Sequence, residues 1–292
     1  MDIQSKARRT LTVALLAATL VSGTAFACYT CYPGKLVVKK FYDKNANGVL
    51  DAGESLISGW PMTLDPGAIT KNTVSGVAVF DGLSPGSYSV TEGTPVQTNW
   101  FQSAPRVNGV VVNPLTGIHV YAGQTKVVKF GNYCKKPSGG KTPGFWSNQN
   151  GEARMLDGSP PSLLPELNLL SSLNLVDANG NAFDPVDYPS FRTWLLDADA
   201  TNMAYKLSSH LAAMQLNVEA GLVNGNSFYI PYGGTINSLI AAANTSLGLY
   251  PYTPAGSAQR ANQEQLKNFL DALNNGANIV SASPCARTFS TY

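Results

Sequence analysis

Charged residues are scarce in this sequence. Asp, Glu, Lys and Arg make up 13% of its 292 residues. Residues 1–27, which have the pattern of a cleaved segment, carry three basic residues and one acid: Lys6, Arg8, Arg9 and Asp2. Without them the formal charge of the chain is +2 − 3 + 1 = 0. Such a chain lacks the basic surface that attracts nucleic acid or anionic membranes. We therefore expect neither as a partner.

Common catalytic motifs are also missing. The sequence has no G-x-S-x-G elbow and no Cys–His signature, and its two histidines, His119 and His210, stand alone. Cys28 and Cys31 have C-x-x-C spacing, but the His that would follow in a c-type haem site is absent. The sequence therefore predicts a protein that is not an enzyme.

A carbohydrate-binding or carbohydrate-active protein is the alternative. Any two carboxylates can meet in space to form a glycosidase pair. Four tryptophans suit either stacking on sugars or packing in a hydrophobic core: Trp60, Trp100, Trp146 and Trp194. An exposed aromatic row would favour this alternative, whereas a closed helical core would favour a structural protein.

Long apolar runs occur only at the N-terminus. A basic start is followed by "LTVALLAATLV" and by small residues at Ala25 and Ala27, the pattern of a secretory signal peptide over residues 1–27. No membrane segment is expected after cleavage. We predict a secreted or cell-surface protein; a periplasmic location, or lipidation of Cys28, which follows the cleavage point, are alternatives.

Four cysteines remain after cleavage. An even number in an exported chain favours disulfides, and four thiols allow three pairings: Cys28, Cys31, Cys134 and Cys285. We predict that Cys134 pairs with Cys285 and closes the C-terminal half as a ring, with Cys28 and Cys31 pairing locally or remaining separate. The competing arrangement links the two N-terminal cysteines to Cys134 and Cys285.

The periodicity of the sequence changes near its middle. After an N-terminal Cys segment (28–34), residues 35–133 contain short alternating strands separated by Gly, Pro, Asn and Asp, as in a β-sandwich. Residues 134–144 are rich in Pro, Gly, Ser and Lys and are predicted to be a linker. Residues 145–292 show helical spacing within 200–221, 234–248 and 257–276. The fold class expected is multidomain β + α.

A calcium loop is predicted directly after the first strand. The segment "DKNANGVLDAGE" (43–54) follows the pattern D-x-[DN]-x-[DN]-G-x5-E, with Gly48 at the sharp bend. Oxygen ligands for Ca²⁺ are expected from six residues: Asp43, Asn45, Asn47, the carbonyl of Val49, Asp51 and Glu54. The plainer interpretation is an Asn-Gly turn with solvated acids.

Residues 35–133 resemble the SdrD B-like domain of bacterial surface proteins, a relative of the prealbumin-like Cna-B repeats. The resemblance rests on "FYDKNANGVLDAGE", "SGWPMTL", "GLSPGSYSVTEGTP" and "KFGNY". It implies a prealbumin-like β-sandwich that holds calcium without flanking helices. Trp60 stands where that family usually has a small β-branched residue.

The second half resembles a helical domain that begins "GYWKNH" and follows such modules. Here the motif is "PGFWSNQNGEA", with Ser147 and Gln149 in place of the Lys and the His. The resemblance implies no reaction.

The Cna-B resemblance also implies an internal isopeptide bond between a Lys of the first strand and an Asn of the last, assisted by an acid. Strand alternation offers Lys39, Glu92 and Asn132 as the candidates. A buried Lys beside a carboxyl can lose its proton and attack an amide. The family position of the Lys holds Phe41, and a surface Lys39 or Lys40 is the plainer interpretation.

The sequence thus predicts an exported surface, matrix or adhesion-type structural protein with a calcium-stabilised β-sandwich. Its expected partners are an extracellular matrix component, a surface protein or a polysaccharide.

Overall fold

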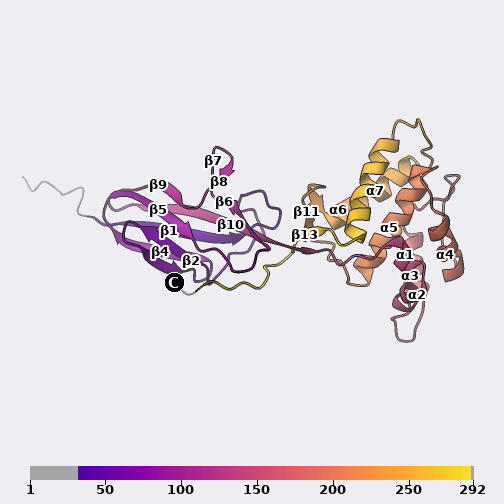
Figure 1. Ribbon diagram of the computed structural model, residues 1–292, viewed down its shortest axis with the longest axis horizontal. Helices are drawn as coiled ribbons and strands as arrows, with labels where there is room; N and C mark the ends of the chain where they lie inside the picture. The colour runs from indigo at the N-terminus through magenta and orange to yellow at the C-terminus, as the bar shows by residue number, and fades with distance from the viewer. Residues whose placement is uncertain (1–31, 291–292) are drawn as a thin grey trace, which may run out of the picture.

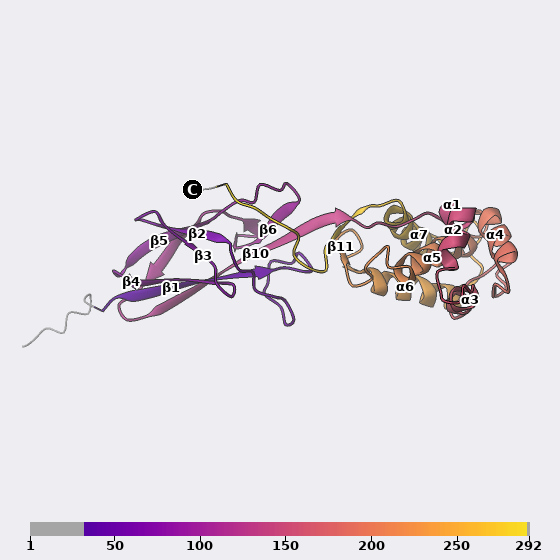
Figure 2. The same cartoon turned by 90° about the horizontal axis from the view of Figure 1, so that it is seen from below.

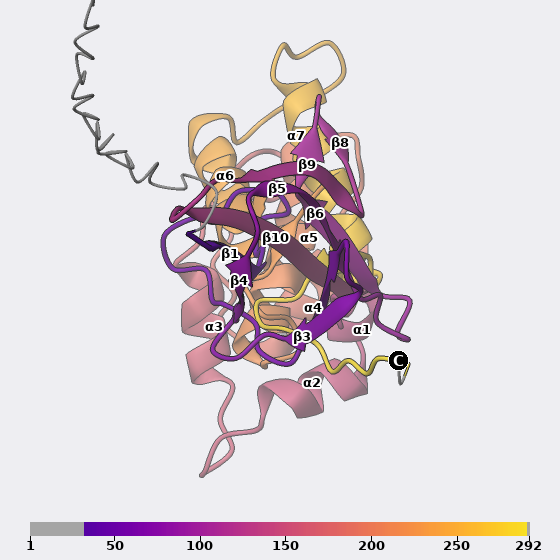
Figure 3. The ribbon, with the colours of Figure 1, turned by 90° about the vertical axis from the view of Figure 1, so that its left-hand side faces the viewer.

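The computed structural model describes residues 32–290. The predicted signal peptide, Cys28 and Cys31 lie outside this range. A β-domain and a helical domain lie end to end along the longest axis of the molecule (Figure 1), and a view from the β-domain end places the helices behind the strands (Figure 3). The predicted class, a β-domain followed by a mainly helical domain, is confirmed.

The larger sheet has seven strands within residues 32–290, in the order β12-β11-β13-β10-β1-β4, with β6 beside β10. Its strands are β1 (Gly34–Tyr42), β4 (Val77–Leu83), β6 (Trp100–Ala104), β10 (Thr125–Pro137), β11 (Phe228–Tyr229), β12 (Gly234–Thr235) and β13 (Asn278–Val280). Strand β1 runs parallel to β10 and antiparallel to β4. Strands β11 to β13 come from the second half of the chain, so this sheet joins the two halves.

A four-stranded antiparallel sheet completes the sandwich. It has the order β3-β2-β5-β9 and consists of β2 (Pro61–Asp65), β3 (Ile69–Asn72), β5 (Gly86–Glu92) and β9 (Leu115–Val120). A small hairpin pairs β7 (Arg106–Val107) with β8 (Val110–Val111). Apolar side chains from both sheets form one core, which includes Leu36, Val38, Met62, Leu64, Phe80, Val90, Ile118 and Phe130. The predicted alternation of buried and exposed side chains is clearest in the first part of β1 and of β4, whereas β3 is exposed throughout.

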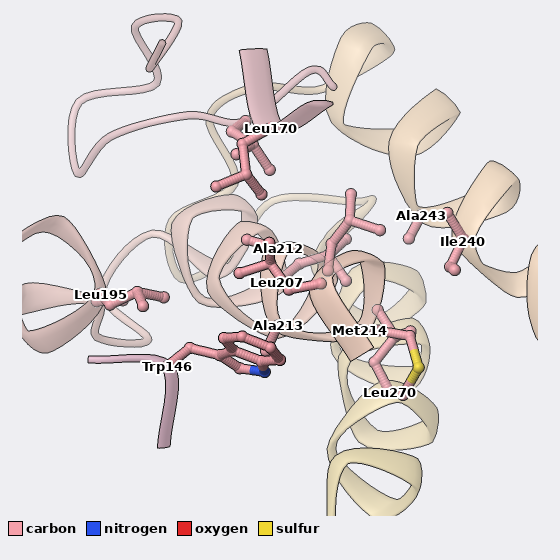
Figure 4. Packing of buried hydrophobic residues seen from close by; sticks show 14 of the residues in the cluster. Trp146, Leu170, Leu195, Leu207, Ala212, Ala213, Met214, Ile240, Ala243 and Leu270 are labelled. Carbon is pink, nitrogen blue, oxygen red and sulfur yellow. The ribbon is translucent and has the colours of Figure 1, made fainter. Parts of the chain in front are cut away.

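The helical domain surrounds one long helix. Its helices are α1 (Pro143–Trp146), α2 (Gln149–Met155), α3 (Leu164–Ser171), α4 (Tyr188–Asp197), α5 (Met203–Glu219), α6 (Ile236–Leu249) and α7 (Arg260–Asn274). Helix α5 is buried by its neighbours on nearly every side, and its apolar side chains lie at the centre of the core (Figure 4). Among the described residues, no helix combines the length and the apolar character needed to cross a bilayer.

Polar caps set the starts of these helices. The Asn202 side chain accepts a hydrogen bond from the backbone of α5, and Thr235 does the same for α6. Asp187 and Ser190 form a reciprocal capping box at α4. The segment from Asp177 forms a turn, because its carboxylate accepts from the Asn179 and Asn181 backbones and Val176 bridges to Ala182.

The predicted boundary at Cys134 does not separate the two domains. Strand β10 continues to Pro137 and pairs with β13, which follows α7. The chain beyond Val280 then runs back onto the β-domain (Figure 2). Residues 281–289 therefore pack with the β-domain and not with the helices expected for residues 145–292.

The Cys134–Cys285 disulfide predicted from the sequence is present, with the two Cα atoms 6.1 Å apart. Its surroundings differ from the prediction, because Cys134 belongs to the core of the β-domain. The ring that it closes contains the whole helical domain, but the ring is fastened inside the sandwich. The bond therefore joins the end of the chain to β10.

Candidate functional site

A lysine amine is buried between the two sheets. Lys40 has no exposed surface, and its Nζ donates to Glu92 Oε2 at 2.6 Å and to Asn132 Oδ1. Glu92 and Asn132 are themselves 5% and 3% exposed. These three side chains form the cross-link site, a name used for them below.

Strand register brings the three side chains together. Lys40 lies on β1, on the face that also buries Leu36 and Val38. Tyr42 pairs with Asn132 in the parallel β1–β10 register, so Asn132 lies diagonally ahead of Lys40 on the neighbouring strand. Glu92 reaches across from the end of β5 in the facing sheet. An acid from one sheet thus meets a Lys and an amide from the other.

The prediction that Lys39 points into the core is wrong. Lys39 lies on the outer face of β1 and is partly exposed, whereas its neighbour Lys40 points inward. By strand alternation Lys39 shares its face with Phe41, which is buried even though that face is the outer one. Gly131 makes room for the Phe41 ring there, since a Cβ on this glycine would lie 2.4 Å from Phe41 Cζ. Because Phe41 is covered there, the outer face of β1 has the large apolar residue that the sequence pattern of a core-facing side would have. Glu92 and Asn132 lie inside, as predicted.

Burial moves both charged partners toward their neutral forms. Loss of solvent lowers the pKa of Lys40 from 10.5 to about 8, although the charge and hydrogen bond of Glu92 oppose this shift. Burial also raises the pKa of Glu92, against the effects of Lys40 and of a hydrogen bond from Asn132. A neutral amine is nucleophilic, and a protonated carboxyl can donate to an amide. The arrangement can therefore support amide formation.

An indole ring forms one wall of the site. The Lys40 Nζ lies 4.0 Å from the centroid of the Trp60 ring. Trp60 is fully buried, and its Nε1 donates to the carbonyl of Gly93, next to Glu92. The sequence contained a signal for this residue, because Trp60 replaces the small residue usual in the resembling family. Its position beside the amine was not foreseen.

The predicted calcium loop follows β1 directly. Asp43 is fully buried, and its carboxylate accepts from the backbones of Asn47 and Gly48. Its own backbone N–H donates to the carbonyl of Asn132 at 2.9 Å, which joins the loop to the cross-link site. Gly48 has φ +82, as the predicted bend requires.

The remaining predicted ligands surround Asp51. Its carboxylate accepts from the side-chain amides of Asn45 and Asn47 at 2.9 and 2.7 Å. The Glu54 carboxylate accepts from the backbones of Lys44 and Asp51. The sixth predicted ligand, the carbonyl of Val49, belongs to an exposed residue whose N–H donates to Asn47 Oδ1.

The loop has the composition of a calcium site. Burial raises the pKa of Glu54 against backbone hydrogen bonds from Asp51 and Lys44, and the charges of Asp43 and Asp51 raise it further, so both carboxylates lie close enough to repel Glu54. A cation held by their oxygens would relieve that repulsion. Within residues 32–290, however, no three His, Cys, Asp or Glu side chains converge as a metal centre. Calcium stays a prediction.

The four tryptophans are packed inside the protein. Their exposed fractions are 0% for Trp60, 8% for Trp100, 1% for Trp146 and 5% for Trp194. Trp146 and Trp194 belong to the core of the helical domain. Their faces are therefore not available for stacking on a sugar.

No protein-family model matches the chain, and no curated protein sequence matches it. Among solved structures, the Bacillus anthracis TIE protein aligns with 36% of this chain and 17% of its own length, at 20% identity and a TM-score of 0.24. GBS52, a minor pilin of Streptococcus agalactiae, aligns with 35% of this chain and 44% of its own, at 16% identity and a TM-score of 0.25. The chain thus spans less than half of either protein, and these scores carry no functional inference.

Proposed function

We propose that the chain is an exported, non-catalytic structural protein of the cell surface or extracellular matrix, with a β-domain locked by a Lys40–Asn132 isopeptide bond. The buried Lys40–Glu92–Asn132 site is the observation that carries this proposal. A covalent tie between the first and last strands of a sandwich serves a protein that must remain folded outside the cell. The Cys134–Cys285 disulfide also suits an oxidising location.

The cross-link requires one acyl transfer. The neutral Lys40 Nζ attacks Cγ of Asn132, a new C–N bond forms, and the C–N bond to Nδ2 breaks. The Asn132 nitrogen leaves as ammonia after it takes one proton from the lysine amine. Glu92 carries this proton and is restored at the end. No oxidant or further reactant is needed.

Calcium is the second part of the proposal. Ions bound by residues 43–54 would stabilise the fold by mass action, because the ligands are assembled only in the folded chain. Since Asp43 is hydrogen-bonded to the backbone of Asn132, order in the loop would extend to the cross-link site.

The helical domain is the part that the β-domain would hold outside the cell. Its interior is filled by apolar side chains from seven helices of the described chain, with α5 at the centre. Its partner in this proposal is a matrix component, a surface protein or a polysaccharide.

Intact-mass measurement of the full chain tests the cross-link. We expect the wild-type mass to be lower by one ammonia and a Lys40–Asn132 branched peptide after digestion. Glu92→Gln should restore the full mass, because it removes the acid with almost no change of shape. Lys40→Met should do the same.

The chain offers a matched control at the adjacent position. Lys39→Met removes the same group from the outer face of the same strand and should leave the ammonia loss unchanged. A well-folded wild-type protein whose mass shows no loss of ammonia would overturn the proposed cross-link. So would a branched peptide that contains Lys39.

A further inference from the structure

The end of the described chain lies along the β-domain. Residues 281–289, here called the C-terminal strap, leave β13 and pass over this domain (Figure 2). The Ser281 N–H donates to the carbonyl of Cys134, and the Val96 N–H donates to the carbonyl of Thr288. The Thr288 N–H donates to the side chain of Gln97 at 2.8 Å. Hydrogen bonds at both ends therefore fix the strap.

Two side chains of the strap pack against the indole that lines the cross-link site. The rings of Phe289 and Trp60 have centroids 5.1 Å apart. The guanidinium of Arg287 lies 5.3 Å from the Trp60 ring and 5.7 Å from the Trp100 ring. The Trp100 Nε1 donates to the carbonyl of Ala286. Trp60 thus contacts both the strap and the Lys40 amine.

The disulfide fastens the strap beside the reacting groups. Cys134 lies two residues after Asn132 on β10, and Tyr42 lies two residues after Lys40 on β1. The Tyr42 hydroxyl donates to the carbonyl of Ser281 at 2.7 Å and lies 3.3 Å from Cys134 Sγ. Alternation in strands places residues i and i+2 on one face. The attachment of the strap and the cross-link site therefore share one wall.

The strap affects the pKa of Lys40 by keeping water away from the cross-link site. Loss of solvent is the main cause of the lowered Lys40 pKa, and the positive charge of Arg287 lowers it further. Without the strap, the Trp60 ring would lose its contacts with Phe289 and Arg287 and become accessible from that side. Water would then reach the wall of the site, and the amine would more easily keep its proton.

We infer that the C-terminal strap is a positioning element that closes the cross-link site through Trp60, and that the Cys134–Cys285 disulfide promotes the Lys40–Asn132 reaction by holding the strap in place. This inference rests on the cross-link proposed above. It sets an order of events: Lys40, Glu92 and Asn132 are synthesised long before Cys285. The amide therefore forms fastest after the helical domain has folded and the strap has returned.

The rate of cross-linking in freshly synthesised protein tests this order. Chains are made in a cell-free system under oxidising conditions, quenched in acid at intervals and analysed for the branched peptide. Cys285→Ser, and separately Arg287→Ala with Phe289→Ala, should slow the reaction by roughly tenfold to a hundredfold at neutral pH. Each unit that the Lys40 pKa regains lowers the neutral amine about tenfold. Ser290→Ala, at an exposed position beside the strap, should react at the wild-type rate.

The pH profile separates positioning from a general loss of stability. Opening of the strap should move the midpoint of the rate from about 8 toward 10.5, the ordinary pKa of lysine. A variant that is merely less stable would lose yield and keep the same midpoint. Equal rates and midpoints in strap variants and wild type would overturn the role of the strap while leaving the cross-link intact.

A second measurement tests whether the strap shields Lys40 in a chain that cannot form the cross-link. In the unlinked Glu92→Gln chain, Lys40 is labelled with a small amine-reactive acylating reagent, and Lys39 on the same strand is the internal reference. Labelling is done at a pH above 10.5, the ordinary pKa of lysine, so that the amine is neutral with the strap open or closed. Reduction of the disulfide, or Cys285→Ser, should then raise Lys40 labelling at least several-fold and leave Lys39 unchanged. Unchanged protection of Lys40 would overturn the strap inference. A wild-type chain that never loses ammonia would overturn the proposed function separately.

Discussion

Lys40→Met should greatly reduce the stability of the β-domain, whereas Lys39→Met should not. The proposed amide closes a loop across a sequence separation of 92, which the chain-entropy model values at about 4.6 kcal/mol. Methionine keeps most of the volume of the lysine side chain, so packing against Trp60 is largely retained. Glu92 is left without its partner, and loss of the Lys40 charge removes an influence that lowers the pKa of this buried carboxyl, which favours its neutral form.

Hydrogen exchange in increasing denaturant measures the effect on each domain separately. Peptides from β1 and β5 report the β-domain, and peptides from α5 report the helical domain. We expect a loss of about 4–5 kcal/mol in the β-domain for Lys40→Met, less than 1 kcal/mol for Lys39→Met, and little change in α5. A loss below about 1 kcal/mol for Lys40→Met would refute the covalent loop.

Three further results are expected. Calcium should raise the melting temperature of the full chain, and a chelator should lower it. Asp43→Ala should abolish this response, whereas Asp81→Ala, at an exposed position on β4, should keep it. A melting temperature that does not respond to calcium would exclude the site. Cross-linking of new wild-type chains should accelerate as the pH rises to about 8 and then level off, because the neutral amine is the nucleophile; a pH-independent rate would contradict this. Burial lowers the pKa of His210 from 6.5 to about 4, although the charge of Asp271 opposes this shift. Between pH 6.5 and 4 only the unfolded chain takes up the proton, so the free energy of unfolding of the helical domain should fall by about 3 kcal/mol. In acid unfolding, His210→Gln should flatten this pH dependence.

Much of the fold follows from local patterns in the sequence. Alternation along β5 predicts that Tyr88, Val90 and Glu92 share a face, and the structure buries Val90 and Glu92 on it. The Thr cap and apolar spacing predict α6 from its first residue. These predictions succeed because each depends on the residues within one element.

The failures arise where burial depends on distant parts of the chain. Phe41 is buried on the outer face of β1 because Leu56 bridges to it and Gly131 leaves space for its ring. The residues of β1 alone do not reveal that Phe41 is covered, so strand alternation pointed to Lys39. The path of the strap is equally non-local, since Thr288 contacts Gln97 across 191 positions of sequence. Trp60 stood out in the sequence as an unexpectedly large residue, but nothing near it in the sequence reveals that the strap covers it.

The proposed Lys40–Asn132 amide and the observed Cys134–Cys285 disulfide both end on β10, and this arrangement would set the order in which they form. The Lys40–Asn132 amide would close a ring that ends at Asn132, and the disulfide closes a second ring that begins at Cys134. The rings are consecutive and do not overlap, so each constrains a different part of the unfolded chain. Tyr133 alone separates them on β10, and its neighbours on both sides point into the core. Closure of the second ring brings the strap onto the wall of the first site, so the proposed amide bond of the β-domain would report that the whole chain has folded.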